Sequence, residues 1–124
     1  MTLPKTQTIE VFVENKKLHN LKILHLSDLH ITKKSTITGV KELVDICNNL
    51  QFDLLVITGD IIDTKVKNIK EQLQILNTIK AQVFYISGNH DLVYGLEDLK
   101  KELTNFTFMD NKCKEIIYKN EIIY

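Results

Sequence analysis

The sequence has little of what marks disulfide-stabilised, thiolate-metal or membrane-spanning proteins. Its two cysteines, Cys47 and Cys113, lie far apart and outside any CxxC or CxxH motif, so neither a disulfide framework nor a thiolate zinc site is expected. Residues 1–13 contain no long apolar run, and the sequence therefore predicts neither a signal peptide nor a transmembrane segment. We expect a cytoplasmic chain, or one peripheral to a membrane.

Net charge is missing as well. Sixteen basic and sixteen acidic side chains balance one another, and a neutral chain lacks the positive charge typical of nucleic-acid-binding proteins. Apolar residues make up 44% of the 124 residues and charged residues 26%, which is the composition of a folded globular protein and not of a disordered one. Without repeats, low-complexity runs or linkers, residues 1–124 are predicted to form a single domain.

Apolar runs alternate with stretches of helical periodicity. Strands of the buried type are predicted at Leu21–Leu26, Leu54–Thr58 and Val83–Ser87. Amphipathic helices are predicted between them, at about Thr38–Leu50 and Asn68–Lys80. Because strands that alternate with helices form βαβ units, the predicted fold class is α/β with a parallel βαβαβ core.

The flanking segments are predicted by the same rules. Thr8–Val13 has the pattern of a short strand, and a helix is predicted from Gly95 to about Leu103. Phe106–Tyr124 contains short β-type pieces typical of a meander or hairpin. Two residues are expected in the core: Cys47, on the apolar side of the first helix, and His25, within the first strand.

A polar cluster follows each of the three predicted strands. These clusters are Ser27–His30 (SDLH), Gly59–Asp63 (GDIID) and Gly88–Asp91 (GNHD). In an open α/β sheet, the carboxyl ends of parallel strands meet at one edge, and ligands bind there. Each cluster alone has a plain explanation as a turn, but three at one edge favour a shared site.

The residue types in these clusters indicate a metal centre. Asp28 and His30 are two residues apart, so on an extended segment they point the same way and can hold one cation. Asp60 adds a carboxylate that can bridge two ions, Asn89 an amide oxygen, and His90 an imidazole. Oxygen and nitrogen ligands without thiolates are typical of sites for Mn, Fe, Zn or similar divalent ions.

The three motifs together resemble those of the calcineurin-like metallophosphoesterase superfamily over Leu21–Asp91. The context LKILHLSDLHI is also similar to bacterial phosphodiesterases that include UDP-2,3-diacylglucosamine hydrolase-like proteins. The resemblance implies the N-terminal half of an αββα sandwich, with a C-terminal β segment after the parallel core. It also implies metal-assisted hydrolysis of a phosphodiester or pyrophosphate substrate by two ions about 3.5–4 Å apart.

Roles for individual residues follow from the same resemblance. It implies that Asp28 and His30 bind the first ion, that Asp60 bridges both ions, and that Asn89 binds the second ion. His90 would contact the phosphate and act as the general acid. The resemblance also implies that Asp63 orients His90 and raises its pKa, and that Asp91 is a turn or supporting residue.

Part of the family pattern is not found in this sequence. The family continues with another metal-binding histidine and a Gly-His-x-His motif, whereas no histidine follows His90 here. We therefore expect the chain alone to hold one ion or fewer tightly. Three explanations stay open. The domain can be truncated or split, with a C-terminal partner chain supplying the missing histidines. It can be an inactive remnant that acts as a binding module. Or copies of it can associate and share ligands.

Overall fold

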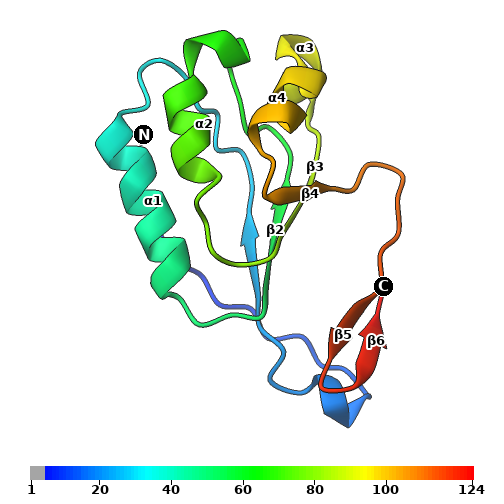
Figure 1. Ribbon diagram of the computed structural model, residues 1–124. Coiled ribbons are helices and arrows are strands. Elements are labelled where there is room, and N and C mark those ends of the chain that lie inside the picture. Colours follow the sequence, from blue (N-terminus) through cyan, green and yellow to red (C-terminus); the bar gives the residue numbers. More distant parts are fainter. Residues whose placement is uncertain (1–4) are drawn as a thin grey trace.

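A four-stranded parallel sheet forms the centre of the protein. The computed structural model describes residues 5–124, and Figure 1 shows the sheet with helices packed against it. The strands lie in the order β1-β2-β3-β4, with bounds Ile23–Leu26 (β1), Leu54–Thr58 (β2), Val83–Ile86 (β3) and Phe106–Phe108 (β4). The first three strands and their parallel pairing confirm the α/β class predicted from the apolar runs.

Helices connect successive strands of the parallel sheet. Their bounds are Ile37–Asn49 (α1), Lys70–Leu76 (α2), Asn89–Tyr94 (α3) and Leu96–Glu102 (α4), with 3-10 turns at Lys16–Leu18 (η1) and Val66–Asn68 (η2). The Thr36 hydroxyl accepts a hydrogen bond from the Gly39 N–H at 2.9 Å, which caps the start of α1. Within residues 5–124, no helix is long and apolar enough to cross a membrane.

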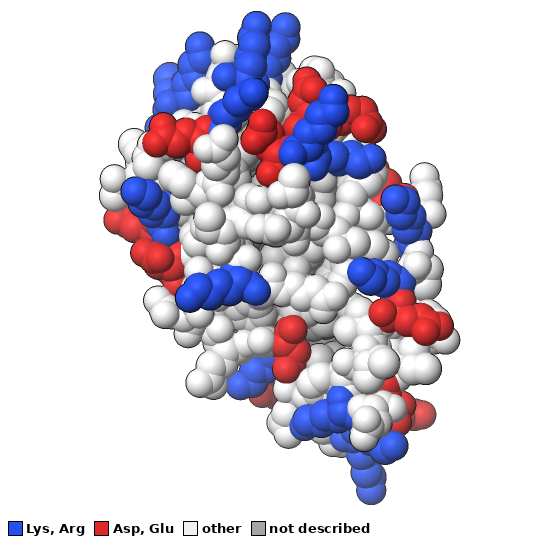
Figure 2. Space-filling view, viewed as in Figure 1, with Lys and Arg blue, Asp and Glu red and all other residues white. Residues whose placement is uncertain are grey.

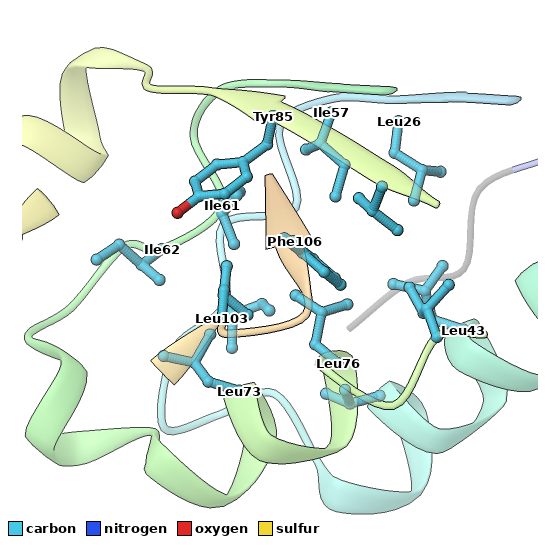
Figure 3. Close-up of a cluster of buried hydrophobic side chains, with 14 of the residues drawn as sticks. Leu26, Leu43, Ile57, Ile61, Ile62, Leu73, Leu76, Tyr85, Leu103 and Phe106 are labelled. Atoms are coloured by element: carbon cyan, nitrogen blue, oxygen red, sulfur yellow. The ribbon is translucent and has the colours of Figure 1, made fainter. Parts of the chain in front are cut away.

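One hydrophobic core lies between the sheet and α1, α2 and α4. Figure 3 shows strand residues Ile57, Tyr85 and Phe106 facing helix residues Leu43 and Leu76. The predicted burial of Cys47 on α1 is confirmed, since its side chain is 1% exposed and burial raises the pKa of its thiol to about 11. The core therefore uses alternate residues of each strand, the ones that point toward the helices.

The other alternate residues of the strands lie on a face that these helices do not cover. Ile23 on β1 and Ile86 on β3 are 54% and 40% exposed. His25 shares this face and is exposed, with its Nε2 atom 2.7 Å from Thr58 Oγ1. The expectation of a core histidine was therefore wrong, because a residue between two core-facing positions of a strand must point to the opposite face.

The N-terminal segment also differs from its prediction. Residues 8–13 form no strand, and Ile9, Val11 and Phe12 are 76%, 78% and 88% exposed. An isolated strand leaves its backbone N–H and C=O groups without partners, so a β-type pattern forms a strand only where another strand pairs with it. Within residues 5–124, no strand pairs with this segment.

The C-terminal segment divides into two parts. Its first piece, β4, joins the main sheet parallel to β3, because α4 connects the two strands as a crossover. The remainder forms an antiparallel hairpin of β5 (Ile116–Tyr118) and β6 (Glu121–Ile123). Lys119 and Asn120 between them both have positive φ angles, 47° and 65°, as a tight two-residue hairpin turn requires. A hairpin was predicted here, but the parallel strand was not.

Substitutions in the core are expected to lower the free energy of unfolding more than substitutions at exposed positions. Leu73 on α2 is fully buried, so Leu73→Ala leaves a cavity and is expected to lower the free energy of unfolding by about 2–5 kcal/mol. Urea unfolding followed by circular dichroism measures the change. Ile117→Ala is the matched control, because Ile117 is 75% exposed and its truncation should cost within about 0.5 kcal/mol. Equal losses in the two variants would contradict the core described here.

Candidate metal centre

The chain segments that follow β1 and β2 continue side by side beyond the sheet. The Asp28 N–H donates to the Gly59 carbonyl at 3.2 Å, and the His30 N–H donates to the Asp60 carbonyl at 2.9 Å. These bonds extend the β1–β2 pairing into the two motifs. The first two polar clusters therefore lie against each other at the carboxyl edge of the sheet, where the sequence predicted them.

The backbone of these segments is held in an unfavourable conformation at three residues. Asp28, His30 and Asp60 have φ angles of 55°, 45° and 52°, in the left-handed region that residues with a side chain rarely adopt. Such conformations cost on the order of 1–3 kcal/mol each and concentrate at functional sites. The extended backbone expected for residues 28–30 is thus not what brings these side chains together.

Two glycines let the segments after β2 and β3 approach closely. Gly59 has a φ angle of 90°, and a Cβ atom there would lie 2.9 Å from the Cα atom of Gly88. A Cβ atom at Gly88 would lie 2.1 Å from Asp60 Oδ1, well inside van der Waals contact. The Asp60 carboxylate therefore occupies space that only a glycine at position 88 leaves open.

Side chains of the first two clusters converge as metal ligands would. Asp28, His30 and Asp60 each offer a donor atom, and these atoms lie within 4.8 Å of one another. His30 Nε2 is 3.7 Å from Asp28 Oδ1. Two donors that are each about 2.1 Å from one ion can be separated by up to about 4.2 Å, so both atoms can reach the same cation.

The two ring nitrogens of His30 have different surroundings. Nε2 faces Asp28, whereas Nδ1 is buried and makes no hydrogen bond within the described part of the chain. Asp63 Oδ2 lies 3.9 Å from Nδ1. An imidazole that binds a metal through one nitrogen normally donates the other N–H to a carboxylate or carbonyl, and Asp63 lies on that side of the ring. The donor types and their spacing fit a divalent cation.

The third cluster contributes the imidazole of His90, which is paired with a carboxylate of the second cluster. His90 Nδ1 lies 2.5 Å from Asp63 Oδ1, and because a carboxylate accepts hydrogen bonds, Nδ1–H is the donor. This hydrogen bond, helped by the charges of Asp63, Asp60 and Asp91, raises the pKa of His90 above its ordinary value. The His90 and His30 rings meet edge to face, 4.9 Å apart.

The same imidazoles offer a second arrangement of donors. His30, Asp63 and His90 also hold donor atoms within 4.8 Å of one another. In that set His90 Nδ1 is already bonded to Asp63, so binding a cation there would break the shortest contact of the site. Asn89 is exposed at the first position of α3, beside His90, and its role as a ligand stays a prediction.

Asp91 is the residue of the site whose importance the sequence did not reveal. It was expected to be a turn or supporting residue, yet its side chain is completely buried. Its Oδ1 accepts from the Ile62 N–H at 3.0 Å and its Oδ2 from the Gly88 N–H at 2.9 Å. An acidic residue three positions after a helix N-cap is the signal that could have indicated the second of these bonds.

Charges of both signs lie at the end of the molecule that carries the site. Figure 2 shows lysines intermingled with acidic side chains at the end of the molecule where η2 and α3 lie, which is the carboxyl edge of the sheet. His30 and His90 are 37% and 43% exposed in their side chains, so solvent reaches both rings. The site is an open edge and not an enclosed cavity.

Fold and site together define an α/β domain with candidate metal-ligand groups at the carboxyl edge of its sheet. The sequence matches the calcineurin-like phosphoesterase family over residues 21–123, which is most of the chain. The chain belongs to that family, a family of phosphoester hydrolases, and the resemblance stated from its motifs is confirmed. The narrower likeness to UDP-2,3-diacylglucosamine hydrolases stays a prediction.

Individual relatives are longer than this chain. An uncharacterized metallophosphoesterase of Helicobacter pylori is 30% identical over 114 residues, which cover 89% of this chain and 30% of the relative. An uncharacterized metallophosphoesterase of Campylobacter jejuni is 32% identical, with 88% and 30% covered. A "probable cyclic nucleotide phosphodiesterase" of Coxiella burnetii is 35% identical over 79 residues, with 57% and 32% covered. The chain thus spans about a third of the length of these proteins.

The His90–Asp63 contact predicts a measurable effect on protonation. Because Asp63 raises the pKa of His90, the ring stays protonated to a higher pH than an ordinary histidine, and Asp63→Asn should lower that pKa toward its ordinary value. NMR titration of the imidazole protons in the metal-free chain measures the shift. Asp45→Asn, which removes an exposed carboxylate on α1, should leave it unchanged. An unaltered His90 pKa in Asp63→Asn would contradict the contact.

Proposed function

We propose that this chain forms the metal-binding part of a phosphoester hydrolase, in which Asp28, His30 and Asp60 hold a divalent ion. The observation that carries the proposal is the convergence of their donor atoms within 4.8 Å of one another. The chemistry that divalent ions supply in such centres is polarisation of a phosphoryl oxygen and a lowered pKa for water. Mn, Fe and Zn all accept this set of oxygen and nitrogen ligands.

His90 is proposed as the general acid. Its Nδ1–H donates to Asp63, which leaves Nε2 as the ring nitrogen available to a substrate. The raised pKa favours the protonated ring, so Nε2–H can donate its proton to the leaving oxygen of a phosphoester. Asp63 fixes the orientation of the ring and stabilises its positive charge, as carboxylate partners of catalytic histidines do.

The substrate is proposed to be a phosphodiester or a pyrophosphate. The open edge accepts a group that projects from a larger molecule, because both imidazoles are partly exposed. The name of the Coxiella burnetii relative supports a phosphodiester. The motif context that resembles UDP-2,3-diacylglucosamine hydrolases supports a pyrophosphate-linked nucleotide as the other member of this class.

A second ion is proposed to need ligands that these 124 residues do not contain. Asp60 can bridge two ions and Asn89 can add an amide oxygen, but a divalent transition metal commonly has four or more ligands. We propose that histidines on further polypeptide, in the same protein or in a partner chain, complete the second site. The alternative is a domain that binds metal without catalysing hydrolysis. Metal titration and a hydrolysis assay distinguish these two possibilities.

Metal binding tests the first part of the proposal. Calorimetric titration of the 124-residue chain with Mn²⁺ should show about one weakly bound ion per chain, and Asp60→Asn should abolish the binding. Asp98→Asn is the control, because Asp98 is an exposed carboxylate on α4 outside the site. Tight binding of two ions per chain would show that the ligand set described here is incomplete.

Hydrolysis of bis-p-nitrophenyl phosphate with Mn²⁺ tests the second part. The 124-residue chain alone should turn over little, because catalytic groups that act together lose most of their effect when one is missing. A partner polypeptide that carries the further histidine and Gly-His-x-His motifs should restore turnover. His90→Ala in that pair should then lower the rate by about 10²–10⁴-fold.

The control for the hydrolysis assay is a histidine on the same sheet. His25 lies on the other face and bonds to Thr58, so His25→Ala should leave the restored turnover unchanged. Robust turnover by the 124-residue chain alone, lost in His90→Ala, would contradict the need for further ligands. Metal binding without turnover in any combination would favour the binding-module alternative.

A further inference from the structure

Asp91 is a buried carboxylate that the proposed chemistry does not use. Its side chain has no solvent exposure, and within residues 5–124 it forms no ion pair. A charged group is costly to bury unless hydrogen bonds satisfy it. Both oxygens of Asp91 meet this requirement with backbone N–H groups, and a buried polar group that is fully satisfied in this way makes the structure around it more rigid.

The two N–H groups that Asp91 binds belong to different loops. Ile62 lies in the loop after β2, between the ligand Asp60 and the orienting residue Asp63. Gly88 lies in the turn after β3, directly before Asn89 and His90. One carboxylate therefore ties the loop that carries Asp60 and Asp63 to the turn that carries His90.

Short contacts join these two loops. The His90 N–H donates to Asp60 Oδ1 at 3.0 Å, and Gly88 lies so close to Asp60 that even a methyl group would clash. The His90 Nδ1 to Asp63 Oδ1 distance is 2.5 Å. A shift of a few tenths of an ångström between the loops would therefore change both the orientation of the Asp60 carboxylate and the His90–Asp63 bond.

Helix capping alone does not account for this arrangement. A carboxylate at the third position of a helix commonly accepts the backbone N–H of the N-cap residue, which here is Gly88. The bond from the Ile62 N–H lies outside that pattern, because Ile62 precedes Asp91 by 29 residues and belongs to another loop. This second bond joins two segments that capping would leave independent.

We propose that Asp91 is a positioning residue that sets the spacing between the Asp60–Asp63 loop and the Gly88–His90 turn. It acts through the backbone: the Ile62 bond holds one loop and the Gly88 bond holds the other, at the separation where Asp60 can bind its ion and His90 can meet Asp63. As far as metal affinity is concerned, this inference rests on the proposed function. The hydrogen bonds themselves are independent of it.

The test replaces one acceptor oxygen by an amide. Asp91→Asn keeps the size of the side chain but sets an N–H₂ group against one of the two backbone N–H groups, so one loop loses its partner. In the metal-free chain, the amide proton of Ile62 or Gly88, whichever loses its acceptor, should then exchange with solvent at least about tenfold faster. Calorimetry should show Mn²⁺ affinity reduced about 10–100-fold, the range expected when a residue that supports metal ligands is changed.

Gln72→Met provides a matched control for lost stability. Gln72 is a buried polar residue on α2 whose Nε2–H donates to the Ser35 carbonyl at 3.1 Å, away from the site. This variant also removes a buried hydrogen bond, and urea unfolding shows how its loss of stability compares with that of Asp91→Asn. It should leave Mn²⁺ affinity and the exchange of the Ile62 amide unchanged.

The measurements distinguish failure of the positioning role of Asp91 from failure of the proposed function. A stability loss in Asp91→Asn with unchanged Mn²⁺ affinity would overturn the proposal and leave a purely structural carboxylate. If the unaltered chain binds no Mn²⁺, the proposed function fails, while the exchange rates of Ile62 and Gly88 still decide whether Asp91 joins the loops. If Asp91→Asn does not fold, the unaltered chain decides: its Ile62 amide should exchange as slowly as amides within β2, and rapid exchange there would refute the proposal.

Discussion

The parallel register of β1, β2 and β3 is the constraint on which both the core and the site depend. Leu26 pairs with Ile57, and Ile57 pairs with Tyr85, so one row of core residues crosses the sheet. Because side chains alternate along a strand, a slip of one residue would turn such a row away from the helices. The same slip would shift one polar motif along the strand direction relative to the motifs on the neighbouring strands. Burial of apolar side chains therefore fixes the relative height of the motifs at the sheet edge.

Beyond the sheet, the site is held by backbone groups more than by side-chain packing. Asp28, His30 and Asp60 adopt left-handed conformations that would relax in a free peptide. Hydrogen bonds between the two loops, such as His30 N–H to the Asp60 carbonyl, and the contact of Gly59 with Gly88 oppose that relaxation. The free energy that sustains these conformations comes from the core beneath them, so the site is well formed only while the sheet is intact.

The sequence predicted those parts of the structure that depend on local patterns. The strand runs and the motifs after them placed Asp28, His30, Asp60 and His90 at one edge, where the structure has them. Features that depend on partners were missed. Thr8–Val13 has a strand pattern but no pairing strand among the described residues, and Phe106–Phe108 became a fourth parallel strand only because α4 returns the chain to that edge. The bond from the Ile62 N–H to Asp91 joins residues 29 positions apart in the sequence, and no local pattern encodes it.

Apolar side chains are exposed on the face of the sheet that the helices do not cover. The free energy of unfolding therefore depends on what surrounds the chain as well as on the chain itself. Ile23 and Ile86 on that face are 54% and 40% exposed, and Phe12 in the N-terminal segment is 88% exposed. Each therefore gives up part of the roughly 1.5–3 kcal/mol that full burial of such a side chain provides. A polypeptide that covers them binds the folded state and not the unfolded one, so mass action adds RT ln(1 + [L]/Kd) to the free energy of unfolding. Two preparations of this chain at different concentrations of such a covering polypeptide would therefore have different melting temperatures, although every bond within the chain is the same.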